Sequence, residues 1–256
     1  MIMTPEAAAD LPPPEPLDLQ RAALFLDLDG TIAEIEAVPE KVGPEHRRSS
    51  LLERLQAALG GRLAVVSGRS LEDLDRILEG RVIAASGSHG LERRHSEAEL
   101  WRAEVHGGLD RVAEAFRGFA EANPGVVLET KPFGCGLHYR LAPEVEEGAR
   151  ALAARLAEES GLQLQLGRMM AEVRVPGPHK GDAVRAFMGA PPFAGAVPVF
   201  VGDDITDEDA FAVMESLGGH GVLVGPARAT AARRRLADVA AVMDWLEGSL
   251  AATARP

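Results

Sequence analysis

Short apolar runs alternate with longer amphipathic stretches along most of this chain, and this alternation limits the folds that it can adopt. From Arg21 the apolar run in AALFLDLDG is followed by the helical pattern RRSSLLERLQAAL and then by the apolar run in RLAVVSG. Strand-length runs that alternate with helical stretches are typical of βαβ units around a parallel sheet. We therefore predict an α/β fold with a Rossmann-like parallel sheet at its centre.

The alternation is interrupted in the middle of the chain. There the pattern indicates a helix, two short strands, a second helix and two more strands, an order that suits a small α+β unit. The strand-and-helix alternation then resumes and continues almost to the C-terminus. The predicted domains are a core of residues 21–100 and 176–256 and an inserted α+β domain of residues 101–175.

The first twenty residues differ in composition from the rest. They contain five prolines and four acidic residues, with no lysine or arginine. Such a segment buries too little apolar surface to offset the entropy that it would lose on ordering. We predict a disordered, proline-rich acidic tail over residues 1–20, and this tail lacks the basic start and apolar stretch of a signal peptide.

Charge and cysteine content exclude several classes of protein. The chain carries 27 Lys and Arg residues against 39 Asp and Glu residues, a formal net charge of −12. Nucleic acids and anionic membranes require a basic surface, so this excess argues against both as partners. The single cysteine, Cys135, excludes an intrachain disulfide and suits a reducing compartment. We expect a cytoplasmic monomer without a nucleic-acid or membrane partner.

Three of the apolar runs end in polar motifs. The first leads into Asp27-Leu28-Asp29-Gly30-Thr31, the second into Ser67-Gly68-Arg69, and a later run into Gly202-Asp203-Asp204. A single Asp after a strand is commonly a turn or helix-cap residue. In open parallel sheets, however, ligands bind beyond the carboxyl ends of the strands. We therefore expect the three motifs to converge on one site.

The acidic residues of these motifs indicate a particular chemistry. Of Asp27 and Asp29, one carboxylate can attack an electrophile while the other handles protons or lends its carbonyl to a metal. Asp203, Asp204 and Asp207 crowd negative charge around a tight turn. Helix caps and dipoles could absorb one or two of these charges. Together with Asp27, the cluster is more typical of a Mg²⁺ site with oxygen ligands and a substrate phosphate.

A phosphate at such a site needs donors on its other side. Ser67 offers a hydroxyl and, with Gly68, backbone amides near the start of a helix. Lys180 begins a predicted helix after a Pro-Gly-Pro turn, where its ammonium could neutralise developing charge. A lysine in this sequence could also be a solvated surface charge.

The motifs resemble those of the haloacid dehalogenase-like (HAD) phosphotransferases. DLDGT, SGR, the lysine of GPHKGDA and GDDITDEDAF occur in that order from about Leu24 to the last helix. The last motif is similar to that of the trehalose-6-phosphate phosphatase family, and residues 88–92, 129–140 and 172–174 agree with it. The resemblance implies a HAD core with a cap domain. It also implies a Mg²⁺-dependent phosphatase that releases trehalose and phosphate from trehalose 6-phosphate through an aspartyl-phosphate, the last step of trehalose biosynthesis.

The resemblance also implies roles for individual residues. Asp27 would be the nucleophile, and Asp29 would protonate the leaving sugar oxygen and then activate water. Ser67 and Lys180 would hold the phosphoryl oxygens, so the expected catalytic residues are these four. The expected metal residues are Asp27, Asp29 through its main-chain carbonyl, Asp203, and, close by, Asp204 and Asp207.

Sugar recognition is expected in the insert, which looks like the mobile cap of this superfamily. The expected substrate-binding residues are Ser67, Gly68, Arg69, His89, Glu129, Lys131, Arg140, Glu172 and Lys180. Those in the insert could equally be solvated charges on a half-exposed sheet, and His89 could be a turn residue.

Two alternatives share much of this pattern. A HAD phosphatase or mutase acting on another sugar phosphate would carry the same core motifs. A phospho-receiver module also places an acceptor Asp, a hydroxyl and a Lys around Mg²⁺. Receivers put their acidic pair before the acceptor strand, whereas the acidic cluster follows it here.

Overall fold

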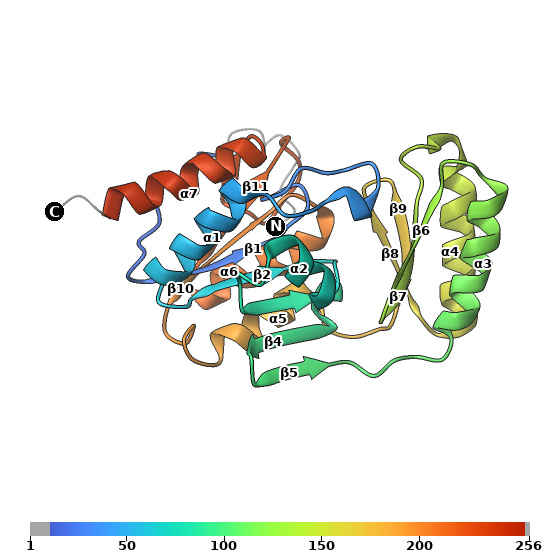
Figure 1. Ribbon diagram of the computed structural model, residues 1–256, viewed down its shortest axis with the longest axis horizontal. Helices are drawn as coiled ribbons and strands as arrows, with labels where there is room; N and C mark the ends of the chain where they lie inside the picture. Colours follow the sequence, from blue (N-terminus) through green and yellow to red (C-terminus); the bar gives the residue numbers. More distant parts are fainter. Residues whose placement is uncertain (1–10, 254–256) are drawn as a thin grey trace. The chain divides into compact units, whose positions relative to one another are not determined.

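The computed structural model describes residues 11–253, which form two compact units (Figure 1). The first comprises the chain up to Ile35, Gly43–Trp101, and the chain from Pro178 onward; the second comprises Glu36–Val42 and Arg102–Gly177. The sequence had placed residues 36–42 in the core. They belong to the second unit because contacts such as that of Arg140 Nη1, which donates to Glu36 O at 2.6 Å, tie them there.

The first unit is built on an eight-stranded sheet with the order β12-β11-β10-β1-β2-β3-β4-β5. The strands are β1 (Ala22–Leu26), β2 (Leu63–Val66), β3 (Ala84–Gly87), β4 (Glu92–Ser96), β5 (Glu99–Arg102), β10 (Val197–Gly202), β11 (His220–Val224) and β12 (Arg234–Leu236). Pairing is parallel from β12 to β3, and β4 joins β3 antiparallel. The predicted α/β fold is confirmed; the β4–β5 hairpin and β12 are additions to it.

Helices follow the strands in the alternating order that the sequence predicts. In the first unit they are α1 (His46–Ala58), α2 (Leu71–Leu78), α5 (Lys180–Met188), α6 (Glu208–Met214) and α7 (Val239–Thr253). Side-chain capping defines the start of α2, where the Ser70 hydroxyl accepts from Asp73 N. The buried core includes Phe25 from β1, whose ring stacks on Phe193 at 5.4 Å, and Phe187 from α5. Burial of these rings supplies much of the apolar contact that holds α5 against the sheet.

The second unit has an antiparallel sheet of four strands in the order β6-β7-β9-β8. Its strands are β6 (Val127–Lys131), β7 (Gly134–His138), β8 (Gln163–Gly167) and β9 (Met170–Arg174), and its long helices are α3 (Leu109–Ala122) and α4 (Glu146–Ser160). Both helices lie on one face of this sheet (Figure 1), where Cys135 and Val173 are buried. Successive side chains on a strand point to opposite faces, so Glu129, Gly136 and Glu172, which share a register row, lie on the other face.

The segment 11–20 corrects one expectation. It has no regular structure, but Leu17 and Leu19 are buried, with Leu19 only 2% exposed. Leu17 N donates to Ser249 Oγ at 3.0 Å, and the Trp245 indole donates to Glu15 O at 2.9 Å. The prediction of disorder is therefore wrong for residues 11–20, because the burial of two leucines and the hydrogen bonds with α7 outweigh the proline-rich composition. Residues 1–10 of the predicted tail lie outside the described residues.

Among residues 11–253, no helix combines the length and the apolar character that crossing a bilayer requires.

Replacing Leu19 by alanine tests whether the segment 11–20 stabilises the first unit. Removal of a fully buried leucine side chain commonly costs about 2–5 kcal/mol, so the Leu19→Ala variant should lose about that much unfolding free energy. The loss is to be measured by urea unfolding of the full chain. The matched control is Leu100→Ala, because Leu100 is 51% exposed in the same unit. Equal stability of the two variants would show that the segment does not contribute.

Candidate active site

The carboxyl ends of three neighbouring strands bring the predicted motifs together. Leu26 at the end of β1 pairs with Val201 of β10 and with Val65 of β2, so the next residues of each strand leave the sheet at the same edge. Asp27 N still donates to Val201 O at 2.9 Å. The expected convergence of the strand ends is confirmed, and it follows from parallel pairing in register.

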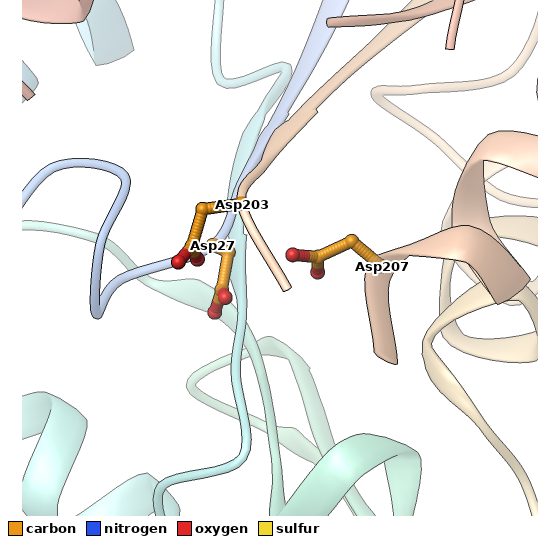
Figure 2. Close-up of side chains that lie close together, drawn as sticks. All are labelled: Asp27, Asp203 and Asp207. Carbon is orange, nitrogen blue, oxygen red and sulfur yellow. The ribbon is translucent and has the colours of Figure 1, made fainter. Parts of the chain in front are cut away.

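An acidic cluster lies at this edge. Figure 2 shows the side chains of Asp27 and Asp203 next to each other at neighbouring strand ends, with the Asp207 carboxylate pointing toward them. Asp207 ends the short helical turn Ile205–Asp207. One oxygen atom from each carboxylate lies within 4.8 Å of the others. Asp27 and Asp207 are buried. Burial raises the pKa of Asp27 well above its usual value; Lys180 opposes this rise, and the charges of Asp207 and Asp203 reinforce it.

The buried ammonium of Lys180 partly neutralises this cluster. Its Nζ lies 2.7 Å from Asp207 Oδ1 and 3.0 Å from Asp27 Oδ2, and the residue is only 2% exposed. Burial opposes the charge, but the two carboxylates hold the pKa of Lys180 above its usual range. Lys180 is the first residue of α5, and a Cβ at Gly181 would lie 2.3 Å from Asp209 O. Glycine at that position therefore permits the close approach of α5 to α6.

The remaining carboxylate, that of Asp203, lacks a protein partner on one side. Its Oδ1 is buried and has no hydrogen-bond partner among the described residues. Burial raises the pKa of Asp203 to about 7, and repulsion from Asp207 and Asp204 contributes to the shift. A Cβ at Gly30, where φ is +78°, would lie 2.2 Å from Asp203 Oδ2, so only glycine leaves room for this carboxylate.

The donor set fits a divalent cation. Three carboxylates face one ammonium, which leaves an excess of negative charge, and one buried oxygen atom is unsatisfied. Hard oxygen ligands of this kind suit Mg²⁺, Mn²⁺ or Ca²⁺. The acidic cluster could therefore hold a metal ion.

Asp29 and Asp204, both predicted at the metal site, have other side-chain partners. Arg69 donates from Nε to Asp29 Oδ2 at 2.7 Å and from Nη2 to Asp29 Oδ1 at 2.8 Å, a bidentate pair. Asp204 Oδ1 accepts from Ile205 N at 2.7 Å and caps the short turn Ile205–Asp207. Side chains of three of the five predicted metal residues thus form the cluster, whereas those of Asp29 and Asp204 lie outside it.

The Ser67-Gly68 turn is supported by His89. His89 N donates to Ser67 O at 3.0 Å, and a Cβ at Gly68 would lie 2.5 Å from the imidazole ring. Ser88 and His89 both have left-handed backbone angles, with φ of +49° and +58°, which carries a conformational cost for residues other than glycine. The surrounding hydrogen bonds offset this cost, and the predicted Ser67, Gly68 and His89 are brought together.

Glu92 stabilises the turn formed by Ser88 and His89. Its buried Oε1 accepts from Leu71 N at 2.8 Å and from Ser88 Oγ at 3.3 Å. A carboxylate at the N-terminus of a helix is favoured by the helix dipole. Glu92 therefore joins the start of α2 to the turn that supports Ser67.

In the second unit, a separate charged cluster lies on the face of the sheet that α3 and α4 do not cover. Lys131 Nζ lies 3.3 Å from Glu129 Oε2 and 3.2 Å from Glu172 Oε2, and His138 Nε2 lies 2.9 Å from Glu129 Oε2. Burial opposes ionisation of Glu129, but Lys131 and His138 lower its pKa to about 2. Three predicted sugar-binding residues meet here. The fourth, Arg140, is separate, because its guanidinium donates to Glu36 O and to Arg168 O at 2.6 and 3.2 Å.

Arg228 is a residue that the sequence interpretation missed. Its Nη2 donates to the main-chain oxygens of Asp203 and Asp204 at 3.2 and 2.8 Å, and its Nη1 pairs with Glu208. It lies in the loop after β11, the strand next to β10. Arg228 could have been found from the sequence, because parallel strands present their carboxyl ends at one edge and Arg228 follows such a strand. We applied this rule only to loops that contain acidic or hydroxyl residues.

Comparison with known proteins connects this site to one family. The family model described as trehalose-phosphatase matches residues 25–240. The chain is 39% identical over 227 residues to the trehalose-6-phosphate phosphatase of Escherichia coli, covering 88% of this chain and 85% of that protein. It is 35% identical to a probable trehalose-phosphate phosphatase of Sinorhizobium fredii, covering 82% and 80%.

Solved structures share the fold. The C-terminal domain of a Candida albicans trehalose-6-phosphate phosphatase superposes with a TM-score of 0.80 at 22% identity, covering 91% of this chain and 93% of that one. A trehalose-6-phosphate phosphatase related protein gives a TM-score of 0.76 at 26% identity, covering 90% and 97%. These likenesses agree with a HAD-like core. Because the family model spans most of the sequence, the chain belongs to the trehalose-phosphatase family.

Proposed function

We propose that this protein hydrolyses trehalose 6-phosphate to trehalose and inorganic phosphate as a Mg²⁺-dependent phosphatase, in the last step of trehalose biosynthesis. The observation that carries the proposal is Asp27, a carboxylate at a strand end that contacts the buried Lys180 at 3.0 Å within an acidic cluster. The names of the E. coli and S. fredii relatives support the choice of substrate.

Asp27 is the nucleophile in this proposal. Leu28 N donates to its Oδ1 at 2.7 Å, and Lys180 contacts its Oδ2, so the carboxylate is oriented before substrate arrives. Its attack on phosphorus forms an aspartyl-phosphate as the bond from phosphorus to the sugar oxygen breaks. Water then attacks that phosphorus, which releases phosphate and regenerates the carboxylate.

Asp29 moves the protons. It donates a proton to the leaving sugar oxygen in the first step and takes one from the attacking water in the second. The bidentate pair with Arg69 holds the Asp29 carboxylate in a defined orientation between these steps. Arg69 is thus assigned here to positioning Asp29, in addition to the substrate contact expected from the sequence.

The phosphoryl group needs positive charge and hydrogen-bond donors. Lys180 neutralises charge on the transferring group, while the Ser67 hydroxyl and the Gly68 amide bind its oxygens. Asp27, Asp203 and the Asp29 carbonyl would hold Mg²⁺, with Asp204 and Asp207 orienting them. When bound, the ion would supply further charge neutralisation at the phosphoryl oxygens.

The sugar is proposed to bind the charged cluster of the second unit. Glu129 and Glu172 can accept hydrogen bonds from sugar hydroxyls, and Lys131, which contacts both, fixes the two carboxylates in place. A disaccharide offers more hydroxyls to such a cluster than a small phosphate ester does. This difference separates the proposal from a phosphatase of broad specificity.

The proposed function is tested by phosphate release from a panel of sugar phosphates. Trehalose 6-phosphate should give the highest kcat/KM, above that for glucose 6-phosphate and mannose 6-phosphate. Dialysis against EDTA should abolish turnover, and added Mg²⁺ should restore it, because the acidic cluster would lose the counterion that the reaction needs. Faster cleavage of another sugar phosphate would refute the substrate, and full activity in EDTA would refute the metal dependence.

The nucleophile is tested by the Asp27→Asn variant. The amide has nearly the same volume but cannot attack phosphorus, so kcat should fall by more than about a thousandfold while the circular dichroism spectrum is unchanged. Phosphate release in saturating Mg²⁺ measures the loss. Asp244→Asn makes the same change at an exposed ion pair and should retain normal kcat. Activity of Asp27→Asn close to that of the control would rule out the assignment.

Sugar recognition is tested by the Glu129→Gln variant. A hydrogen bond to a charged group contributes about 1.5–3 kcal/mol, so KM for trehalose 6-phosphate should rise about tenfold or more. Hydrolysis of p-nitrophenyl phosphate should be unchanged, because this substrate lacks the sugar and cannot form the hydrogen bond that is lost. The control is Glu147→Gln, an exposed glutamate of the same unit. Equal losses on both substrates would argue against a sugar-binding role.

A further inference from the structure

The acidic turn that carries Asp203 is held by a guanidinium. Residues 203–209 contain five carboxylates among seven residues. Lys180 contacts this segment through the side chain of Asp207, whereas Arg228 contacts its backbone at Asp203 O and Asp204 O. The contact of Arg228 with the backbone restrains the position of the Asp203 Cα atom. A contact with a side chain, such as that of Lys180 with Asp207, leaves the backbone less restrained.

The same guanidinium is anchored at the other end of the turn. Glu208, the first residue of α6, pairs with Arg228 Nη1, and its second oxygen accepts from Ala231 N at 2.8 Å. The side chains of Arg228 and Glu208 are 29% and 26% exposed, so this pair is partly shielded from water. Arg228 therefore bridges the backbone before the helical turn and the helix after it. The planar fork of arginine suits such a bridge, which a lysine cannot reproduce.

We propose that Arg228 is a positioning residue for the metal site: it holds the Asp203–Asp204 backbone so that the Asp203 carboxylate stays beside Asp27, within reach of one divalent cation. This inference rests on the metal dependence in the proposed function. Without a restraint, the repulsion of Asp203 from Asp207 and from Asp27 would favour rotation of the turn toward solvent.

Two effects of Arg228 on a metal ion have opposite signs, which makes the inference testable. As a nearby positive charge, Arg228 repels a cation, so removing it would strengthen metal binding. As a positioning residue, it preorganises the ligands, so removing it would weaken metal binding, commonly by about 10–100-fold. The direction of the change in affinity therefore identifies the dominant role.

The experiment measures Mn²⁺ binding to the full chain by the electron paramagnetic resonance signal of free Mn²⁺. Manganese is the probe because it takes the same oxygen ligands as Mg²⁺. The Kd for Mn²⁺ should rise about tenfold or more in Arg228→Gln. The matched control is Arg233→Gln, which removes the same charge from an exposed pair with Glu215. Its Kd should stay within about twofold of wild type, as expected for an exposed ion pair.

Two further variants separate positioning from charge and from folding. Arg228→Lys keeps the positive charge but cannot form the bridge, so it should also raise the Kd for Mn²⁺ about tenfold. If Arg228→Gln does not fold, this variant alone tests the positioning role. Glu208→Gln should raise the Kd less. Its effect should not add to that of Arg228→Gln, because both residues act through one hydrogen-bond network. The unfolding temperature of each variant is measured without metal. A variant that loses only stability should unfold at a lower temperature but keep the wild-type Kd for Mn²⁺.

The possible outcomes distinguish this inference from the proposed function. If wild type binds Mn²⁺ and Arg228→Gln binds it equally well or more tightly, the positioning role is overturned while the metal-dependent function stands. Wild-type affinity in Arg228→Lys would also overturn it, because charge alone would then suffice. If the wild-type chain does not bind Mn²⁺, the metal dependence fails and this inference fails with it.

Discussion

The buried ammonium of Lys180 stabilises the acidic cluster at the strand ends. Asp27 and Asp207 are both removed from water, and two such carboxylates would repel each other strongly without a cation between them. Lys180 Nζ lies within 3.0 Å of both. Removing one partner from such a network leaves an uncompensated buried charge, which makes the ion pairs interdependent. The close approach of α5 to α6 through Gly181 is needed to place this ammonium.

The surrounding structure holds this network by strand pairing and by side chains that bind the backbone. Parallel pairing sets Asp27 and Asp203 side by side, Glu92 joins α2 to the turn of Ser88 and His89, and Arg228 holds the acidic turn by its carbonyls. Each support comes from a different strand end or loop. Preorganisation of this kind matters for phosphoryl transfer, because its catalysis depends mainly on positioning and charge.

Parts of the fold and site were predictable because they depend on local pattern. Strand-length apolar runs placed β1, β2 and β10, and the rule that parallel strands present their carboxyl ends at one edge predicted that Asp27, Ser67 and Asp203 would meet. Lys180 was also identified, since it begins a helix beside those ends. The segment 11–20 was misjudged because composition does not show that Leu17 and Leu19 are buried, nor that their backbone binds Ser249 and Arg62, far away in the sequence.

The sequence by itself determined the α/β class, the alternation of the core strands and helices apart from β4, β5 and β12, and the set of acidic, hydroxyl and lysine residues at the strand ends, because these follow from periodicity and spacing. Only the tertiary structure decided which of those groups pair. It turned the Asp29 carboxylate to Arg69, brought Glu129, Lys131 and Glu172 into one cluster, separated Arg140 from it, and set Arg228 under the acidic turn. Such pairings depend on distances between residues far apart in the chain, which packing sets and spacing along the sequence does not.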